Sequence, residues 1–366
     1  MSYDHKRYMP CLRWKQGEYQ AIMHLSSRAK NLITPLIEIP EMGFDFETGK
    51  NSKSIDDHVS KFADRILKKW GKAGFFLDMS LVDPTNRMAD GSHPLSSVFA
   101  DLRGRECSPI PVTGVHRDLE YQKSLQQIIT KEKRGVCFRV TLEEAAGGSL
   151  KTDLDKQLKG AKLSPKDCDL LLDLASPNYE PVDGFSKLIF EIIKSLPYLK
   201  EWRSFVLLGT SFPSTMAEVS HGQSVIPRSE WTLYKDLLKK LSVAKIRIPT
   251  FGDYTINHPS VSKIDMRFVK PFATIRYTID DGWLIIKGNN IRDFGYGQYK
   301  DHCSELMKSS YYFGDSFSQA DDYISKCARG MAKNGNLSTW RWVGTNHHLE
   351  KLTQDISKLF GTSNNP

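Results

Sequence analysis

Short apolar runs that end in a charged residue recur along the first two thirds of this 366-residue chain. Clear examples are Leu32–Glu38, Phe75–Asp78, Val136–Arg139 and Leu170–Asp173. Each run is followed by a stretch whose apolar positions recur with a helical period. A strand that is buried on both faces of a parallel sheet reads as a continuous apolar run, not as an alternating one. The pattern therefore predicts strands and helices that alternate around a parallel sheet.

Eight such strand–helix units can be counted, and about 250 residues is the usual size of a (β/α)₈ barrel. A doubly wound open sheet is the alternative, but it usually carries a glycine-rich turn after its first strand. Here that turn, Arg13–Glu18, has a single glycine. We therefore predict an α/β fold with a TIM-like barrel over residues 1–270. The expected strands are 8–14, 33–39, 74–79, 110–115, 135–141, 169–174, 204–209 and, more weakly, 245–248.

The pattern changes after residue 270. Two β-rich runs, Phe272–Ile279 and Trp283–Lys287, flank Asp280-Asp-Gly282, and an Asp-Gly turn between such runs favours a hairpin. Helices are expected near 299–308, 318–329 and 348–360. A single hairpin makes a thin core by itself. We therefore expect residues 271–366 to form a hairpin and helical extension that packs on the barrel.

Composition narrows the class of protein only slightly. The net charge of +8 is compatible with a phosphate-bearing partner, although solvated lysine-rich helix faces explain it equally well. The six cysteines include no CxxC pair, so no zinc site of familiar spacing is indicated. The first residues lack the apolar core of a signal peptide, and no run is long enough to span a bilayer. We expect a cytoplasmic protein with reduced cysteines and no membrane partner.

Several familiar signatures are missing from the sequence. It has no GxxxxGK[ST], no HExxH, no GxSxG and no GxGxxG after a strand. Their absence argues against common NTPases, zinc proteases, serine hydrolases and dinucleotide oxidoreductases. No organic cofactor is expected.

In a barrel, the charges that follow the strands meet at one mouth. Three of them are carboxylates, on Glu38, Asp78 and Asp173, and we expect these to hold Mg²⁺ or Mn²⁺ or to act as a catalytic base. The cations would bind the phosphate of a substrate, and they are Arg13, Lys15, Arg117 and Arg139. A metal with a cationic clamp suits the hydrolysis of phosphodiesters. The alternative is a set of salt bridges that stabilise the barrel rim.

Two other segments are candidates for ligand contacts. Thr210 and Ser211 lie in a loop of small residues after the seventh expected strand, where many barrels bind phosphate, and residues 251–254 follow the eighth strand in the equivalent place. His347 or the adjacent His348 is a candidate general base or ligand. Trp342 is a candidate platform for stacking on a base, although core packing explains most tryptophans. Part of this last segment is expected to cap the final helix through Thr345 or Asn346.

The opening Tyr8–Ala21, together with Pro35–Ile39, resembles the start of the "beta family proteins" of bacteria and their phages. Phe294–Tyr299 and Trp340–His348 are similar to the far end of that family. The resemblance implies a phage or antiviral-defence setting. It implies no reaction, so no catalytic residue is taken over from it.

Three functions remain open at this point. The first is a hydrolase that acts on a nucleotide or nucleic acid with a divalent metal. The second is a binding or sensor protein in phage–host conflict, with the C-terminal extension contacting a protein partner. The third is a nucleic-acid binder without catalysis, whose affinity would have to fall steeply with salt.

Overall fold

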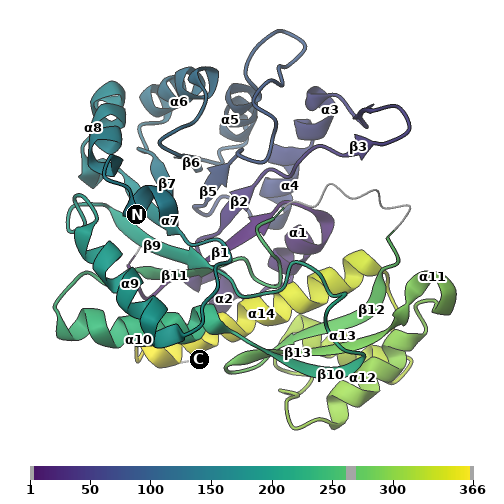
Figure 1. Ribbon diagram of the computed structural model, residues 1–366. Helices are drawn as coiled ribbons and strands as arrows, with labels where there is room; N and C mark the ends of the chain where they lie inside the picture. The colour runs from purple at the N-terminus through teal and green to yellow at the C-terminus, as the bar shows by residue number, and fades with distance from the viewer. Residues whose placement is uncertain (1–3, 261–268, 363–366) are drawn as a thin grey trace.

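The computed structural model describes residues 4–260 and 269–362. Eight parallel strands close into a barrel in the order β1-β11-β9-β8-β7-β6-β5-β2, with helices around it (Figure 1). The strands are β1 (Tyr8–Arg13), β2 (Leu36–Glu38), β5 (Phe76–Asp78), β6 (Ile110–Thr113), β7 (Cys137–Thr141), β8 (Asp169–Asp173), β9 (Ser204–Gly209) and β11 (Thr250–Asp253). Because β1 pairs with both β2 and β11, the sheet is closed. The predicted barrel is confirmed.

Helices follow most strands and bury one apolar stripe against the barrel. The helices of the barrel region are α1 (Gln16–Met23), α2 (Ser27–Leu32), α3 (Ile55–Val59), α4 (Phe62–Lys69), α5 (Pro94–Gly104), α6 (Leu119–Glu132), α7 (Leu142–Ala146), α8 (Leu150–Ala161), α9 (Val182–Ser195) and α10 (Ser229–Val243). In α8, for example, Leu150, Leu154 and Leu158 are buried at intervals of four residues. The Asp118 side chain caps α6 by accepting a hydrogen bond from the Tyr121 N–H.

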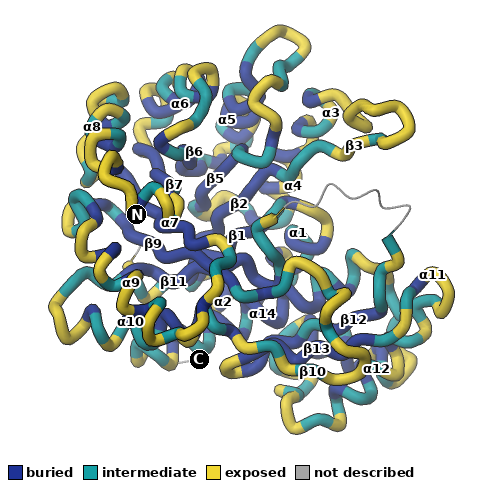
Figure 2. Tube along the Cα trace, viewed as in Figure 1, coloured by how far each residue is buried: buried dark blue, intermediate teal, exposed yellow. Residues whose placement is uncertain are grey.

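Strand alternation divides the apolar side chains between two cores. One set fills the barrel interior and includes Cys11, Leu36, Phe76, Leu171 and Val206. The other set points outward and packs under the helices, so the strands are buried on both faces (Figure 2). Charged side chains follow at the carboxyl ends of the strands.

The eighth strand was misplaced by the sequence pattern. It was expected at 245–248, but it is β11, Thr250–Asp253, so residues 251–254 are not a loop. The earlier segment carries Arg247, whose guanidinium donates to the backbone oxygens of Leu199 and Trp202 at 3.0 and 2.5 Å. A half-exposed arginine that binds loop carbonyls does not suit a barrel strand. The buried Thr250–Asp253 run does.

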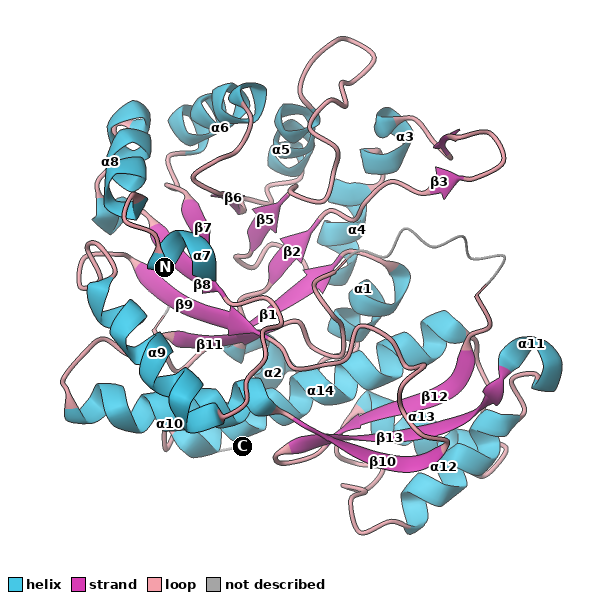
Figure 3. Cartoon of the chain, in the orientation of Figure 1, coloured by secondary structure: helices cyan, strands magenta, loops and turns pink. Residues whose placement is uncertain are grey.

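The C-terminal hairpin is confirmed, and it gains a strand that the sequence did not indicate. Strands β12 (Phe272–Thr278) and β13 (Gly282–Asn290) are antiparallel neighbours. Strand β10 (Gly222–Pro227), from the connection between β9 and α10, pairs with the other edge of β13. Helices α11 (Ile291–Phe294), α12 (Gln298–Lys308) and α13 (Gln319–Ala328) accompany this sheet (Figure 3). A small hairpin, β3 (Phe44–Asp45) with β4 (Lys50–Asn51), links β2 to α3.

The last helix, α14 (Leu337–Leu359), is longer than predicted. Asn336 caps it by accepting the Thr339 N–H, so Thr345 and Asn346 lie inside the helix and do not cap it. Its first half packs Trp340 and Val343 into the core of the C-terminal sheet, and its second half adds apolar side chains to the outer barrel core. No helix of the described residues is long and apolar enough to cross a membrane.

Candidate functional site

Arg139 lies at the centre of the barrel mouth. It extends from β7, and its Nη1 donates to Glu38 Oε1 and Asp78 Oδ2, both at 2.8 Å. Its Nε donates to Asp173 Oδ2 at 2.9 Å. Its Nη2 donates to the Tyr254 hydroxyl at 2.8 Å. The three predicted carboxylates therefore do meet, but around an arginine of the same chain.

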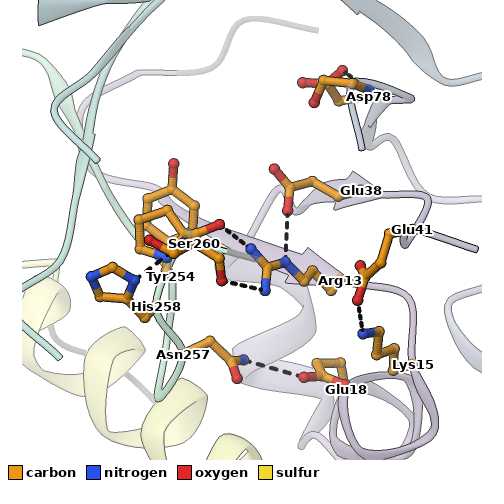
Figure 4. Close-up of polar contacts among 12 residues, drawn as sticks. Arg13, Lys15, Glu18, Glu38, Glu41, Asp78, Tyr254, Asn257, His258 and Ser260 are labelled. Carbon is orange, nitrogen blue, oxygen red and sulfur yellow. Dashed lines mark hydrogen bonds and ion pairs between the residues drawn. The ribbon is translucent and has the colours of Figure 1, made fainter. Parts of the chain in front are cut away.

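Two more arginines complete this group. The Arg13 Nε lies 3.6 Å from Glu38 Oε2, and its guanidinium also donates to the backbone oxygens of Pro259 and Ser260 (Figure 4). The Arg117 Nη2 lies 3.3 Å from Asp78 Oδ1. We call these six residues the mouth cluster: Arg13, Arg117, Arg139, Glu38, Asp78 and Asp173. Three positive charges balance three negative ones, so the cluster as a whole is neutral.

Burial makes these contacts strong. Asp78 is wholly buried, and Glu38 is 2% exposed. Burial alone would raise the pKa of Asp78, but Arg117 and Arg139 beside it outweigh that effect and lower the pKa below its ordinary value. Burial opposes the charge on Arg139 as well, yet Tyr254 and the surrounding carboxylates raise its pKa well above the ordinary value. The charges on Asp78 and Arg139 are therefore both kept at neutral pH.

The predicted metal does not fit this arrangement. The Arg139 guanidinium hydrogen-bonds to all three carboxylates that were expected to hold Mg²⁺ or Mn²⁺. Among the residues that the structure describes, no three His, Cys, Asp or Glu side chains are grouped as metal ligands. A buried divalent ion here would also face three guanidinium groups. The positive charge that balances the carboxylates is supplied by the chain itself.

Arg117 also lines a pocket of about 340 Å³ next to the mouth, which we call the Arg117 pocket. Its walls come from the loops after β5 and β6 and include Ser80, Asp83, His116 and Asp118. The carboxylates of Asp83 and Asp118 offset the one guanidinium. The pocket therefore carries no excess of positive charge that would attract a phosphate.

Lys15 and the loop after β9 lie apart from the mouth cluster. The Lys15 Nζ donates to Glu41 Oε1 at 2.5 Å, and its side chain is half exposed (Figure 4). The backbone N–H groups of Thr210 and Ser211 bind Ala175 O and the Glu230 carboxylate at 2.9 and 3.1 Å. Because these amides already have partners inside the protein, the loop offers no phosphate cradle.

His347 and Trp342 are also away from the mouth. His347 is wholly buried, with Nδ1 2.9 Å from Asp321 Oδ2 and Nε2 2.9 Å from Thr278 O. It joins α14 to the C-terminal sheet and cannot touch a ligand. The Trp342 ring is partly buried between the rings of His24 and Tyr323, at centroid distances of 5.1 and 5.4 Å. Both residues hold α14 in place.

A second polar group, of which the sequence indicated only His348, lies between strands β1 and β11 and helix α14. Asp253, at the end of β11, accepts the Tyr8 hydroxyl at 2.5 Å and lies 2.9 Å from His348 Nε2. Nearby, the wholly buried Arg228 lies 3.5 Å from Glu230, and burial raises the pKa of Glu230 to about 6. Tyr8, Asp253 and His348 come from distant parts of the chain, so no local motif could have indicated their contacts.

Together the closed parallel barrel, the neutral mouth cluster and the attached C-terminal sheet define a (β/α)₈-barrel protein with an added α/β extension. A family model described as Beta protein matches residues 8–354. The chain belongs to this family, and the match supports a phage-associated protein. No curated protein matches the chain.

Proposed function

We propose that this protein is a phage-associated binding protein whose ligand carries phosphate, and that it does not hydrolyse that ligand. One observation supports this most directly. The three carboxylates at the mouth, which a hydrolase would use as metal ligands or base, are each held by Arg139. Arg117 and Arg139 lower the pKa of the buried Asp78, so this carboxylate accepts a proton poorly. The net charge of +8 favours an anionic ligand.

Hydrolysis with a metal would need the mouth cluster to open. Removing Arg139 would leave Asp173 without its arginine, and Glu38 and Asp78 with one arginine each, which costs several kcal/mol. Metal binding would have to exceed that cost before any chemistry began. A binding protein needs no such rearrangement, because the mouth cluster can stay closed and fill the mouth of the barrel.

The test combines turnover with metal binding. The purified protein is incubated with Mg²⁺ or Mn²⁺ and a panel of nucleotides, RNA and DNA, and products are separated by chromatography. We expect no product and no change in the thermal unfolding midpoint with either metal. Product formation that Asp78→Asn abolishes would refute the proposal. So would a metal-induced rise in midpoint that Asp78→Asn abolishes, provided that the variant still folds by circular dichroism.

A further inference from the structure

A pocket of about 380 Å³ lies between the barrel wall and helices α3 and α4. We call it the Trp14 pocket. Its inner wall includes Trp14, which follows β1, and Ile39, which follows β2. Their predecessors Arg13 and Glu38 belong to the mouth cluster. Because successive side chains at a strand end point to opposite faces, this pocket is a separate site on the outer face of the same edge.

Part of the Trp14 pocket is apolar and is lined by Trp14, Ile39, Pro40 and Phe62, with His58 and Ser60 beside them. The Trp14 ring packs against the rings of Phe62 and Tyr19, at centroid distances of 6.3 and 5.8 Å, and Trp14 is 4% exposed. Its Nε1–H is buried and has no hydrogen-bond partner in the described part of the chain. A buried donor without a partner costs about 1–3 kcal/mol. A ligand that supplies an acceptor, after a small shift of the ring, would recover that energy.

The rim of the pocket is cationic. Lys53, Lys61 and Arg65 line it, and all three side chains are exposed. Within residues 4–260 and 269–362, no carboxylate forms an ion pair with Lys53 or Lys61. Asp57 supplies one negative charge to the lining, and its carboxylate already accepts the Ser54 hydroxyl at 2.7 Å. Three positive charges against one leave an excess of two, in contrast to the neutral mouth cluster.

From this combination we propose that the Trp14 pocket binds an organic phosphate of about nucleotide size. The apolar body of the ligand would lie on Trp14, Ile39 and Phe62, and its phosphate would meet Lys53, Lys61 and Arg65. The volume falls in the range of about 300–1,000 Å³ that is usual for small-molecule sites. This inference rests on the proposed binding function and gives it a site and a ligand class.

The test is isothermal titration of the full chain at low salt with three probes: AMP, ribose 5-phosphate and pyrophosphate. AMP combines a flat apolar body with a phosphate, whereas the other two lack the base or the whole body. We expect AMP to bind most tightly. The double variant Lys53→Ala/Lys61→Ala should weaken AMP binding about tenfold or more, since about 1.4 kcal/mol corresponds to a factor of ten. Trp14→Phe, which keeps a ring but loses the N–H, should weaken it about three- to tenfold.

Matched variants separate this site from general electrostatics. Lys68→Ala removes an exposed lysine from the same helix α4, outside the pocket, and should leave AMP affinity unchanged. Arg117→Gln changes the neighbouring pocket and should also have no effect. The inference is overturned if none of the probes binds, if pyrophosphate binds as tightly as AMP, or if Lys68→Ala weakens binding as much as the double variant. Binding followed by cleavage would refute the proposed function but leave this site standing.

Discussion

Replacing Arg139 by leucine removes the residue that holds the barrel mouth together. The guanidinium contacts Glu38, Asp78 and Asp173 within 2.9 Å, and leucine can contact none of their oxygens. Breaking one buried ion pair by removing a single partner costs about 3–5 kcal/mol. Arg13 and Arg117 still neutralise part of the charge on Glu38 and Asp78. We therefore expect Arg139→Leu to lower the free energy of unfolding by at least about 4 kcal/mol at pH 7.

The same change should make stability depend on pH in a particular direction. In the wild type the pKa of Asp78 is lowered, so its ion pairs stabilise the fold above the unfolded pKa of about 3.9 and are lost as the pH falls through the folded pKa. In Arg139→Leu, burial without that cation raises the pKa values of the carboxylates. The folded variant then takes up protons between about pH 7 and 4, so its deficit relative to wild type should shrink as the pH falls.

Urea titrations followed by circular dichroism at pH 7 and pH 5 measure both effects. Arg105→Leu is the matched control, because Arg105 pairs with the exposed Asp64 on the surface, where such pairs contribute little. Its unfolding midpoint should stay close to wild type at both pH values. A loss below about 1 kcal/mol for Arg139→Leu, or a loss of the same size at both pH values, would refute the reasoning about a buried cluster.

Three further outcomes follow from other parts of the fold. Burial raises the pKa of Glu230 from 4.5 to about 6, so protonated Glu230 favours the fold below pH 4.5, and this contribution is lost as the pH rises through 6. Glu230→Gln does not titrate, so between these limits its free energy of unfolding, measured by urea titration, should rise by about 2 kcal/mol relative to wild type, at 1.36 kcal/mol per pH unit. Burial lowers the pKa of His348 despite the opposing effect of Asp253, so the folded state favours the neutral ring and stability is lost as the pH falls below 6.5. In His348→Gln the melting temperature should fall less steeply on the acid side, and an unchanged profile would contradict a lowered pKa for His348. A Cβ on Gly17 would lie 2.2 Å from Arg341 Cγ, so Gly17→Ala should lower the free energy of unfolding by about 1–3 kcal/mol as α1 and α14 separate. Gly104→Ala on α5, where a Cβ meets nothing within 4 Å, should be neutral or slightly stabilising in the same titration, and equal losses in both variants would exclude the close approach as the cause.

The barrel could be predicted from the sequence because burial on both faces of a strand leaves a continuous apolar run, and seven of the eight runs lie where strands form. The eighth failed for a physical reason. Gly252 in β11 would place a Cβ 2.9 Å from Met9 O, so this strand contains a glycine where it approaches its neighbour closely, and the glycine weakens the apolar signal. The third strand of the C-terminal sheet, β10, is mostly exposed or half-buried, and its sequence therefore carries no strong strand pattern.

The candidate site was predictable in position but not in chemistry. A charge after each strand indicates a mouth where charges meet, and Glu38, Asp78, Arg139 and Asp173 do meet there. Whether carboxylates surround a metal or an arginine depends on side-chain reach and rotamer, which apolar patterning does not encode. The polar groups of Thr210 and His347 bind partners that fold back from elsewhere in the chain, and such contacts leave no signal in the local sequence.

The alternation of side chains at the ends of β1 and β2 gives the inner and outer faces of one sheet edge different charges. Arg13 and Glu38 turn inward and close the mouth with balanced charges, which favours rigidity over exchange with a ligand. Trp14 and Ile39, each the first residue after its strand, turn outward under α3 and α4, where the surrounding cations are not balanced. A ligand is attracted by charge that the protein has left uncompensated. The ligand that we propose would therefore meet the protein at the outer face of this edge.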